Sequence, residues 1–492
     1  MKSKYLISVI IPVFRVEDYL DECLMSIISQ TIGFDNIQVI LVNDGSPDDS
    51  ALICERFAAD HPDNVIYIEQ PNSGVAAARN KGLDLAEGEL VTFLDGDDKW
   101  SEDSFGIAYD AYKKHPEVSV FSCRMIFFDG ENGEHQLNYK YKEDRTIDIR
   151  EDYNFPQLSS SSVFIRADAA KGHRFRDGLK YSEDFRFINE ILLDDPNMML
   201  LKDPVYWYRR RQSGDSAIQR SVTDPDYYTP TCRQVYRHLF DLSIERFGYV
   251  LRYLQFCVMY DLKWRLKIPL AETGLDDNSR EEYCAVIVHL LQEIDDDIIL
   301  EQKRIALALQ LYALELKHGR SVYDKLHIDE QGVLEYEVNP LLDLPSHPAV
   351  RIDSVKLREG GFIIHGQLNP PLTDDRLKYT YSLNGIAHDI QAVPTDENIK
   401  TYWHGILKRD LSFTIDEQID CSHVNELTFI VSYDGREFAT KPRFSASSGL
   451  DNRREEVNDG DRVAYRRGTA ICFEQRTLTG SLARHFAKLL SR

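Results

Sequence analysis

The first hundred residues alternate between short apolar runs and segments in which apolar residues recur at helical spacing. Continuous apolar runs bounded by polar residues predict buried strands. These runs are 7–14, 39–42, 65–68 and 90–94, and the segments between them that predict helices are 17–30, 47–59 and 73–86. Strands that alternate with helices of this length favour right-handed β-α-β units and a mostly parallel sheet.

The alternation is less regular after residue 98, and the pattern changes twice more. We expect a helix at 104–115, a strand at 118–128, a polar excursion at 129–152, strands at 159–166 and 199–208, and a helix at 183–193. Residues 225–319 are helical in pattern. Short alternating segments broken by Asn384-Gly385 and Asp434-Gly435 then predict hairpins of a small β-sandwich.

These changes divide the chain into four predicted parts. They are an α/β domain at 1–222, a helical region at 223–340, a β-rich domain at 341–446 and a polar tail at 447–492. The tail ends in a basic amphipathic helix, with Leu482, Phe486, Leu489 and Leu490 on one face. Such a helix can contact an anionic membrane surface, although packing or disorder explains the pattern equally well.

Composition narrows the classes of function. A net charge of −23 argues against general binding to nucleic acid, which needs clustered positive charge. The eight cysteines show no Cys-x-x-Cys spacing, so we expect reduced thiols rather than a zinc site or a disulfide framework. No secretory signal and no long apolar run are visible, so a cytosolic protein without membrane spans is expected.

Three carboxylates follow the fourth predicted strand. Asp95, Asp97 and Asp98 lie together at its carboxyl end, where open α/β sheets bind ligands. Carboxylates so close repel one another unless a cation lies between them, and hard oxygen ligands suit Mg²⁺ or Mn²⁺, which then bridges a diphosphate. An isolated Asp-x-Asp is a weak signal, and its place fourth in a series of strand–helix units strengthens it.

Two further groups fall at the same predicted edge of the sheet. Asp44, after the second strand, can accept a hydrogen bond from the N–H edge of uracil or from a ribose hydroxyl, or it can simply cap a helix. Asn72 and Gly74 precede a helix from whose first turns Arg79 projects. That helix terminus suits a phosphate, whereas an ordinary surface arginine is the simpler alternative.

Glu183 and Asp184 begin a predicted helix, where acidic residues commonly complement the helix dipole. One of them can also act as a general base that deprotonates an attacking hydroxyl. Downstream, Arg209, Arg210 and Arg211 lead into a Gly-containing loop with Ser213 and Ser216. Such a loop can close over a diphosphate, or it can be a solvated basic loop in an acidic protein.

The ordered motifs Val9–Phe14, Val42–Ser46, Asn72–Gly74 with Ala78–Asn80, and Phe93–Asp98 resemble those of family 2 glycosyltransferases of the GT-A fold. The resemblance covers roughly the first 215 residues. It implies a nucleotide-sugar donor, Mn²⁺ or Mg²⁺, and transfer of a hexosyl or N-acetylhexosaminyl group with inversion. Implied roles are nucleotide contacts by Pro12, Phe14, Asp44 and Arg79, metal binding by Asp97 with Asp95, and a base, Asp184, beside Glu183.

The longer layout is similar to bacterial enzymes that decorate wall teichoic acid or build capsular polysaccharide. It implies a UDP-sugar donor, a surface-glycan acceptor and work at the inner face of the membrane, with self-association through the β-rich domain as a further expectation. The Arg211–Ser216 segment resembles a mobile phosphate-contacting loop of those enzymes. A Gln-x-x-Arg-Trp motif, typical of processive synthases, is missing.

Two other functions remain open at this point. A nucleotidyltransferase uses a related sheet, but its Gly-rich, lysine-bearing loop is replaced here by Pro12-Val13-Phe14-Arg15. A non-catalytic carbohydrate-binding or scaffold protein is the second alternative, and the presence of Asp97 together with Glu183 and Asp184 argues against it.

Overall fold

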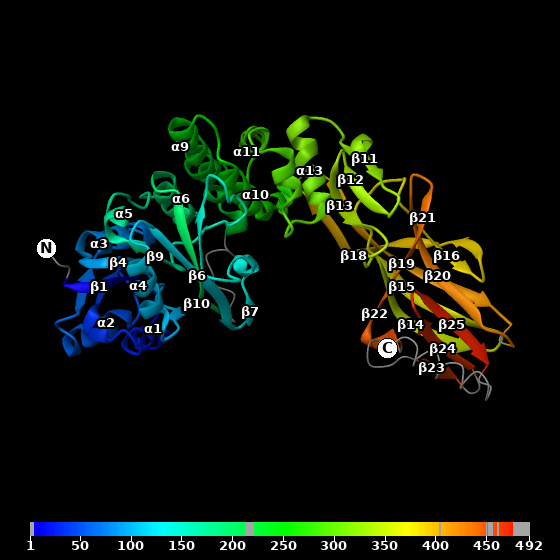
Figure 1. The fold of residues 1–492 in the computed structure, drawn as a ribbon, viewed down its shortest axis with the longest axis horizontal. Helices are drawn as coiled ribbons and strands as arrows, with labels where there is room; N and C mark the ends of the chain where they lie inside the picture. Colours follow the sequence, from blue (N-terminus) through cyan, green and yellow to red (C-terminus); the bar gives the residue numbers. More distant parts are fainter. Residues whose placement is uncertain are drawn as a thin grey trace. The chain divides into compact units, whose positions relative to one another are not determined.

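The structure is a computed structural model (Figure 1). It describes residues 4–211, 221–402, 405–420, 422–448, 450, 456–459 and 462–475, with backbone alone for 395–402 and 405–410. Two compact units are present. The first comprises Met1–Arg265 and Leu270–Arg304, and the second comprises Leu266–Pro269 and Ile305–Arg492.

The first unit is built on a sheet with ten strands in the described residues. Its main order is β3-β2-β1-β4-β9-β6-β10-β5, with β7 paired to β6 and β8 paired to β10. Strands β1 to β3 run parallel, as do β1 with β4 and β6 with β10, whereas β9 is antiparallel to both of its neighbours. The strands are β1 Tyr5–Val13, β2 Ile37–Asn43, β3 Val65–Glu69, β4 Gly88–Phe93, β5 Lys99–Trp100, β6 Val120–Asp129, β7 Gly133–Glu134, β8 Arg145–Asp148, β9 Val163–Arg166 and β10 Asn197–Arg210.

Helices cover both faces of this sheet. Helix α3 lies on one side of the sheet and α1 and α2 lie on the other (Figure 1). Val9 and Ile11 of β1 belong to a core shared with α1, α2 and α4, whereas Ile10 lies against Gly82 of α3. The helices of the first unit are α1 Leu20–Ile28, α2 Ser50–Asp60, α3 Val75–Leu85, α4 Ser104–Lys114, α5 Ala167–Lys171, α6 Glu183–Asp194, α8 Thr229–Thr231, α9 His238–Phe247, α10 Arg252–Leu266, α11 Asp277–Gln292 and α12 Asp296–Leu300, with a π-helical turn at Cys232–Arg237 between α8 and α9.

The second unit begins with α13 (Leu307–His318) and continues as β-structure. Its core joins β14, β15 and β19 to β16, β20, β24 and β25. The strands are β11 Leu326–Ile328, β12 Val333–Tyr336, β13 Asn339–Asp343, β14 Val350–Arg358, β15 Gly361–Leu368, β16 Lys378–Leu383, β17 Ile386–Asp389, β18 Ala392–Tyr402, β19 Gly405–Gln418, β20 Asn425–Tyr433, β21 Arg436–Thr440, β22 Arg443–Phe444, β23 Glu456–Asp459, β24 Arg462–Arg467 and β25 Ala470–Gln475.

The predicted fold class is confirmed: a mostly parallel α/β sheet is followed by helices and then by antiparallel β-structure. Three local predictions are wrong. Residues 326–340, expected to be helical, belong to the three-stranded sheet β11-β12-β13. Strands β23 to β25 lie where a polar tail was expected, and residues 159–162 precede β9 rather than belonging to it. The predicted terminal helix lies outside the described residues.

Two aromatic residues of the β-rich region take part in core packing. Tyr381 is buried in the core of the second unit and Tyr379 packs against it. The side chains of Tyr402 and Trp403 are outside the described residues. None of the helices in the described part of the chain has the length and apolar character needed to cross a membrane.

Candidate active site

The candidate residues gather where the parallel strands β1, β2 and β4 end. Pro12 is the second-last residue of β1. Phe14 follows the strand, and 40% of the surface of Phe14 is exposed. Asp44 follows β2, Asn72 and Gly74 lie between β3 and α3, and Asp95 follows β4. Because carboxyl ends of parallel strands share one edge of the sheet, residues distant in sequence meet here.

Asp44 joins two of these loops. Its Oδ1 accepts hydrogen bonds from Gln70 Nε2 (2.8 Å) and Ser73 N (2.8 Å), and its Oδ2 accepts one from Gly74 N (2.9 Å). It therefore holds the loop after β3, and none of these bonds caps a helix. The loops approach so closely that a Cβ on Gly45, whose φ is +65°, would lie 2.9 Å from Asn72 N. Only glycine suits that position.

The three aspartates after β4 have different surroundings. Asp98 is 2% exposed and accepts hydrogen bonds from Tyr206 Oη (2.7 Å) and Arg209 N (2.7 Å), so it anchors β10. Asp97 and Asp95 are partly exposed. Burial and the neighbouring Asp97 and Asp95 raise the pKa of Asp98 well above its usual range. Burial likewise raises the pKa of Asp97, although Arg211 opposes this effect.

Arg79 connects the cluster after β4 to the start of α6. Its guanidinium donates from Nη2 to Asp95 Oδ1 (2.9 Å), and from Nη1 to Glu183 Oε1 (3.0 Å) and Asp184 Oδ1 (2.7 Å). The residue is 3% exposed, on a helix of otherwise small residues that packs against β1 and β2. Burying a guanidinium requires paired charges, and these carboxylates supply them. Arg79 is thus not an ordinary surface arginine.

The acidic pair at the start of α6 is partly shielded from solvent. Glu183 and Asp184 have side chains that are 13% and 21% exposed. Burial, reinforced by Asp184, raises the pKa of Glu183 to about 7, although Arg79 opposes the shift. Burial also raises the pKa of Asp184. Ser182, immediately before them, has a φ of +60°, a strained backbone conformation that is more frequent at functional sites.

The arginines at the end of β10 surround the same aspartates. Arg211 donates to Asp97 Oδ2 from Nε (2.9 Å) and Nη2 (2.6 Å). Arg209 donates from Nε to the carbonyl oxygen of Asp97 (2.8 Å) and pairs with Glu22 and Asp129. The predicted contacts of Arg209 and Arg211 with a diphosphate stay predictions, and Ser213 and Ser216 lie outside the described residues.

The sequence reasoning missed several polar residues of the site. Ser160 Oγ donates to Asp184 Oδ1 (2.6 Å), and Ser161 Oγ donates to Asp95 Oδ2 (3.3 Å). The run Ser159–Ser162 was assigned to a strand. Four successive serines are a poor start for a buried strand, and that composition was the available signal. Tyr206, which donates a hydrogen bond to Asp98, was predicted only as part of an apolar strand.

The residues fit a divalent cation bound together with a substrate. No group of three or more protein ligands for a metal occurs among the described residues. Mg²⁺, however, is usually held by one or two carboxylates together with phosphate oxygens and water. Asp95 and Asp97 provide such carboxylates, and the guanidinium of Arg211 already binds Asp97 as a cation would.

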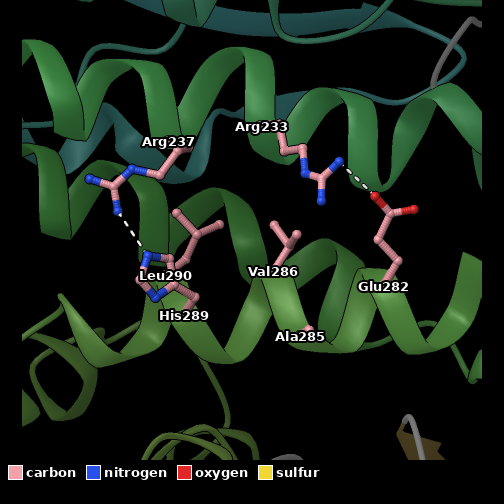
Figure 2. A pocket seen from close by; sticks show the side chains of 7 residues that line it. All are labelled: Arg233, Arg237, Glu282, Ala285, Val286, His289 and Leu290. Atoms are coloured by element: carbon pink, nitrogen blue, oxygen red, sulfur yellow. Dashed lines mark hydrogen bonds and ion pairs between the residues drawn. The ribbon is translucent and has the colours of Figure 1, made fainter.

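A separate cavity lies in the helical part of the first unit, between the π-helical turn and α11 (Figure 2). It is lined by Arg233, Arg237, Glu282, Ala285, Val286, His289 and Leu290. Arg233 pairs with Glu282 (2.6 Å), and Arg237 pairs with Asp241 and Glu293. Both arginines are neutralised by carboxylates, so the described residues that line the cavity offer no unpaired arginine to attract a phosphate.

Sequence comparison relates the chain to glycosyltransferases. Residues 8–173 match the family model described as glycosyl transferase family 2. The minor teichoic acid biosynthesis protein GgaB of Bacillus subtilis (strain 168) is 33% identical over 457 residues, which are 91% of this chain and 50% of GgaB. GgaA of the same organism is 32% identical over 303 residues, 60% of this chain and 68% of GgaA. The chain thus spans half the length of GgaB.

Structural comparison supports the fold. A crystal structure of S. aureus TarS matches 96% of this chain and 86% of that chain, with a TM-score of 0.55 and 16% identity. TarS residues 1–349 in complex with UDP-GlcNAc match with a TM-score of 0.52 and 20% identity, covering 68% of this chain and 97% of that chain. GgaA is more than 30% identical to this chain, which covers more than two thirds of its length, and residues 8–173 match the family model, so the chain belongs to glycosyl transferase family 2.

Proposed function

We propose that this enzyme transfers a sugar from a UDP-sugar to a hydroxyl group of a teichoic-acid-type or other surface-glycan acceptor. The transfer requires Mn²⁺ or Mg²⁺ and inverts the anomeric carbon. The observation that carries the proposal is Arg79, which brings the cation-binding Asp95 and the acidic pair Glu183-Asp184 to one guanidinium. Support for donor and acceptor comes from the names of GgaB and GgaA and from the UDP-GlcNAc complex of TarS.

The loops after β1, β2 and β3 bind the nucleotide. Phe14 offers an exposed ring next to Pro12, and Asp44 accepts a hydrogen bond from uracil. Asn72 and Gly74 form the turn that Asp44 holds in place. Uracil presents an N–H group, and an ionised carboxylate can accept a hydrogen bond from it but has no proton to donate.

Asp95 and Asp97 would hold the cation, which would supply positive charge to the departing diphosphate. Arg211 lies beside them and supplies positive charge near the same oxygens. Asp184 takes the proton of the acceptor hydroxyl as the new oxygen–carbon bond forms at the anomeric carbon. The bond from that carbon to the diphosphate breaks, and UDP leaves with the electron pair. Attack opposite the leaving group gives inversion in one step.

Calorimetric titration with UDP, with and without Mn²⁺, tests the donor site. We expect binding to the wild type that depends on Mn²⁺, and at least tenfold weaker binding to Asp97→Ala, because a cation ligand is lost. Glu55→Ala is the control, since Glu55 is an exposed carboxylate of α2. Failure of the wild type to bind UDP or any UDP-sugar would contradict the proposal.

The role of Asp184 is tested separately. Asp184→Asn keeps the shape of the side chain but cannot take a proton, so donor binding should persist while sugar transfer falls by about a hundredfold or more. UDP release from UDP-sugars in the presence of wall teichoic acid measures transfer. Unchanged transfer in Asp184→Asn would assign the base elsewhere.

Two further proposals concern the membrane and self-association. We expect the enzyme to act at the inner face of a bacterial membrane and to contact it through the basic terminal segment, which flotation with anionic vesicles tests. We also expect the enzyme to self-associate through the β-rich region, which sedimentation velocity tests.

A further inference from the structure

The serine run Ser159–Ser162, immediately before β9, lies directly against the candidate active site. Ser160, Ser161 and Ser162 are 0%, 3% and 4% exposed. The backbone of the run is fixed at several points: Ser161 N donates to Ser159 Oγ (3.1 Å), and Ser162 O accepts from Cys123 N (2.9 Å) on β6. The hydroxyl groups of Ser160 and Ser161 are therefore presented from a rigid support.

The hydrogen bonds around Asp184 distinguish its two carboxylate oxygens. Oδ1 accepts from Arg79 Nη1 (2.7 Å) and from Ser160 Oγ (2.6 Å). A carboxylate oxygen has two lone pairs, so these two donors saturate Oδ1. Among the described residues, both hydrogen bonds that side chains donate to Asp184 use this oxygen, and the backbone of Ser160 also stabilises the carboxylate and lowers its pKa. Oδ2 accepts neither of the two side-chain bonds and is the oxygen with room for a proton.

Asp95 is held in the same manner from the other side. Its Oδ1 accepts from Arg79 Nη2 (2.9 Å), and its Oδ2 accepts from Ser161 Oγ (3.3 Å). Two adjacent serines thus hold two of the three carboxylates that Arg79 contacts. The two terminal nitrogens of Arg79 donate to Asp95, Glu183 and Asp184, and the residue is 3% exposed.

We propose that Ser160, Ser161 and Arg79 are positioning residues that fix Asp184 and Asp95 relative to each other and make Oδ2 of Asp184 the atom that receives the acceptor's proton. This inference rests on the proposed role of Asp184 as the base. It gives Arg79 a task other than the nucleotide contact that the family resemblance implies. It also assigns a function to two serines that no sequence motif marks.

The proposal has a physical basis in the geometry of proton transfer. A general base must lie within hydrogen-bond reach of the proton it removes, and small displacements of a reacting group are costly. A carboxylate that lacks the Ser160 bond can rotate about its χ2 angle, which is a broad torsion. The proton acceptor then spends part of its time in unproductive orientations, while the nucleotide-binding loops are unaffected.

The deciding experiment compares Ser160→Ala, Ser160→Thr and Ser162→Ala. Ser162 is the matched control, because it is equally buried but its hydroxyl contacts Gln157 rather than a carboxylate. UDP release is measured from each UDP-sugar with Mn²⁺ and wall teichoic acid, and UDP affinity is measured by calorimetry. For Ser160→Ala we expect about a tenfold fall in kcat with unchanged UDP affinity and unchanged KM for the donor, because a hydrogen bond to a charged group is lost.

Ser160→Thr retains a hydroxyl and should recover most of that activity, while Ser162→Ala should equal the wild type. The same measurements on Arg79→Lys should show lost turnover with UDP affinity retained. Full activity of Ser160→Ala, or weakened UDP binding in Arg79→Lys, would overturn the inference and leave the proposed function standing. A wild type that neither binds nor turns over any UDP-sugar would overturn the proposed function and the inference together. Melting temperatures identify any variant that fails to fold. If Ser160→Ala fails to fold, the activity of Ser160→Thr tests the inference in its place.

Discussion

At the scale of residues, the carboxylates around Arg79 outnumber its single positive charge. Arg79 contributes one positive charge against the carboxylates of Asp95, Glu183 and Asp184, all within 3.0 Å of its terminal nitrogens. Burial of like charges is costly, so part of the folding free energy is given up at this point. Such local cost is common where chemistry requires groups in unfavourable surroundings.

This cost predicts a pH dependence of stability. The pKa of Glu183 is raised by burial to about 7, above its value in an unfolded chain, so the folded state binds its proton more tightly. Stability contributed by this group is therefore present at low pH and is lost as the pH rises through about 7. Glu183→Gln removes the titration and should raise the melting temperature at pH 8.5 by about 3 °C.

Differential scanning calorimetry of the metal-free protein between pH 5.5 and 8.5 measures the effect. The difference between Glu183→Gln and the wild type should shrink as the pH falls, because both side chains are then neutral. Glu55→Gln, at an exposed position, should show no such trend. A difference independent of pH would show that Glu183 does not titrate in this range.

At the scale of elements, Gly82 of α3 lies tightly against β1, whereas Gly106 of α4 has room for a side chain. A Cβ on Gly82 of α3 would lie 2.3 Å from Ile10 Cγ2, whereas a Cβ on Gly106 of α4 would meet Thr31 Oγ1 at 3.7 Å, an ordinary contact. Both helices have 11 residues, with Gly82 in the interior of α3 and Gly106 in the first turn of α4. The same substitution should therefore have opposite effects.

Gly82→Ala should destabilise the protein by about 1–3 kcal/mol through overpacking. Gly106→Ala should stabilise it by about 0.5–1 kcal/mol, because alanine loses less backbone entropy in a helix. Urea denaturation of the two variants measures both. Since α3 carries Arg79, we also expect Gly82→Ala to lower turnover and Gly106→Ala to leave turnover unchanged. Equal effects on stability would show that α3 can move away from β1.

Elements whose surroundings are uniform could be predicted from sequence. Strands β1, β2 and β4 are buried on both faces, so their apolar runs indicate them directly. The sheet β11-β12-β13 was missed because its short strands follow a long helical pattern, and only the alternation in Leu326–Ile328 and Val333–Tyr336 indicates it. Charged residues obscured β23 and β24, whereas β25 is a short, mainly apolar and buried run that was overlooked.

The site was predictable to the extent that its chemistry lies in strand-end motifs. Asp44, Asp95, Asp97, Glu183 and Asp184 were all named from sequence, and the structure brings the last four together with Arg79 and Arg211. The contacts of Ser160 and Ser161 depend on β9, which is antiparallel between β4 and β6. Local sequence does not encode that pairing, so the partners of the two serines could not be foreseen.

At the scale of the whole molecule, each of the two units has a hydrophobic core of its own among the described residues. One core lies within residues 7–206 and the other within residues 350–473. The site residues all belong to the first unit, which extends to Arg304. We therefore expect residues 1–304 to fold and to bind UDP with the affinity of the full chain.

A shorter version, residues 1–276, provides the contrast. It removes α11, whose Tyr283 packs against Tyr228 at 5.1 Å, and Glu293, which pairs with Arg237. We expect the 1–276 fragment to lose cooperative unfolding, as measured by circular dichroism. Loss of UDP binding in the 1–304 fragment would show that the second unit takes part in the donor site.

The surroundings of Asp44 limit what the side chain can distinguish. Oδ1 has two hydrogen bonds and Oδ2 has one, so a single acceptor position remains on the whole carboxylate. Uracil brings a proton to such a position, whereas cytosine presents a lone pair at the corresponding ring nitrogen. The first is attracted and the second is repelled by the same oxygen. Discrimination between the two pyrimidines would thus depend on the presence or absence of one hydrogen atom, read by a residue whose remaining bonds hold the loop around it.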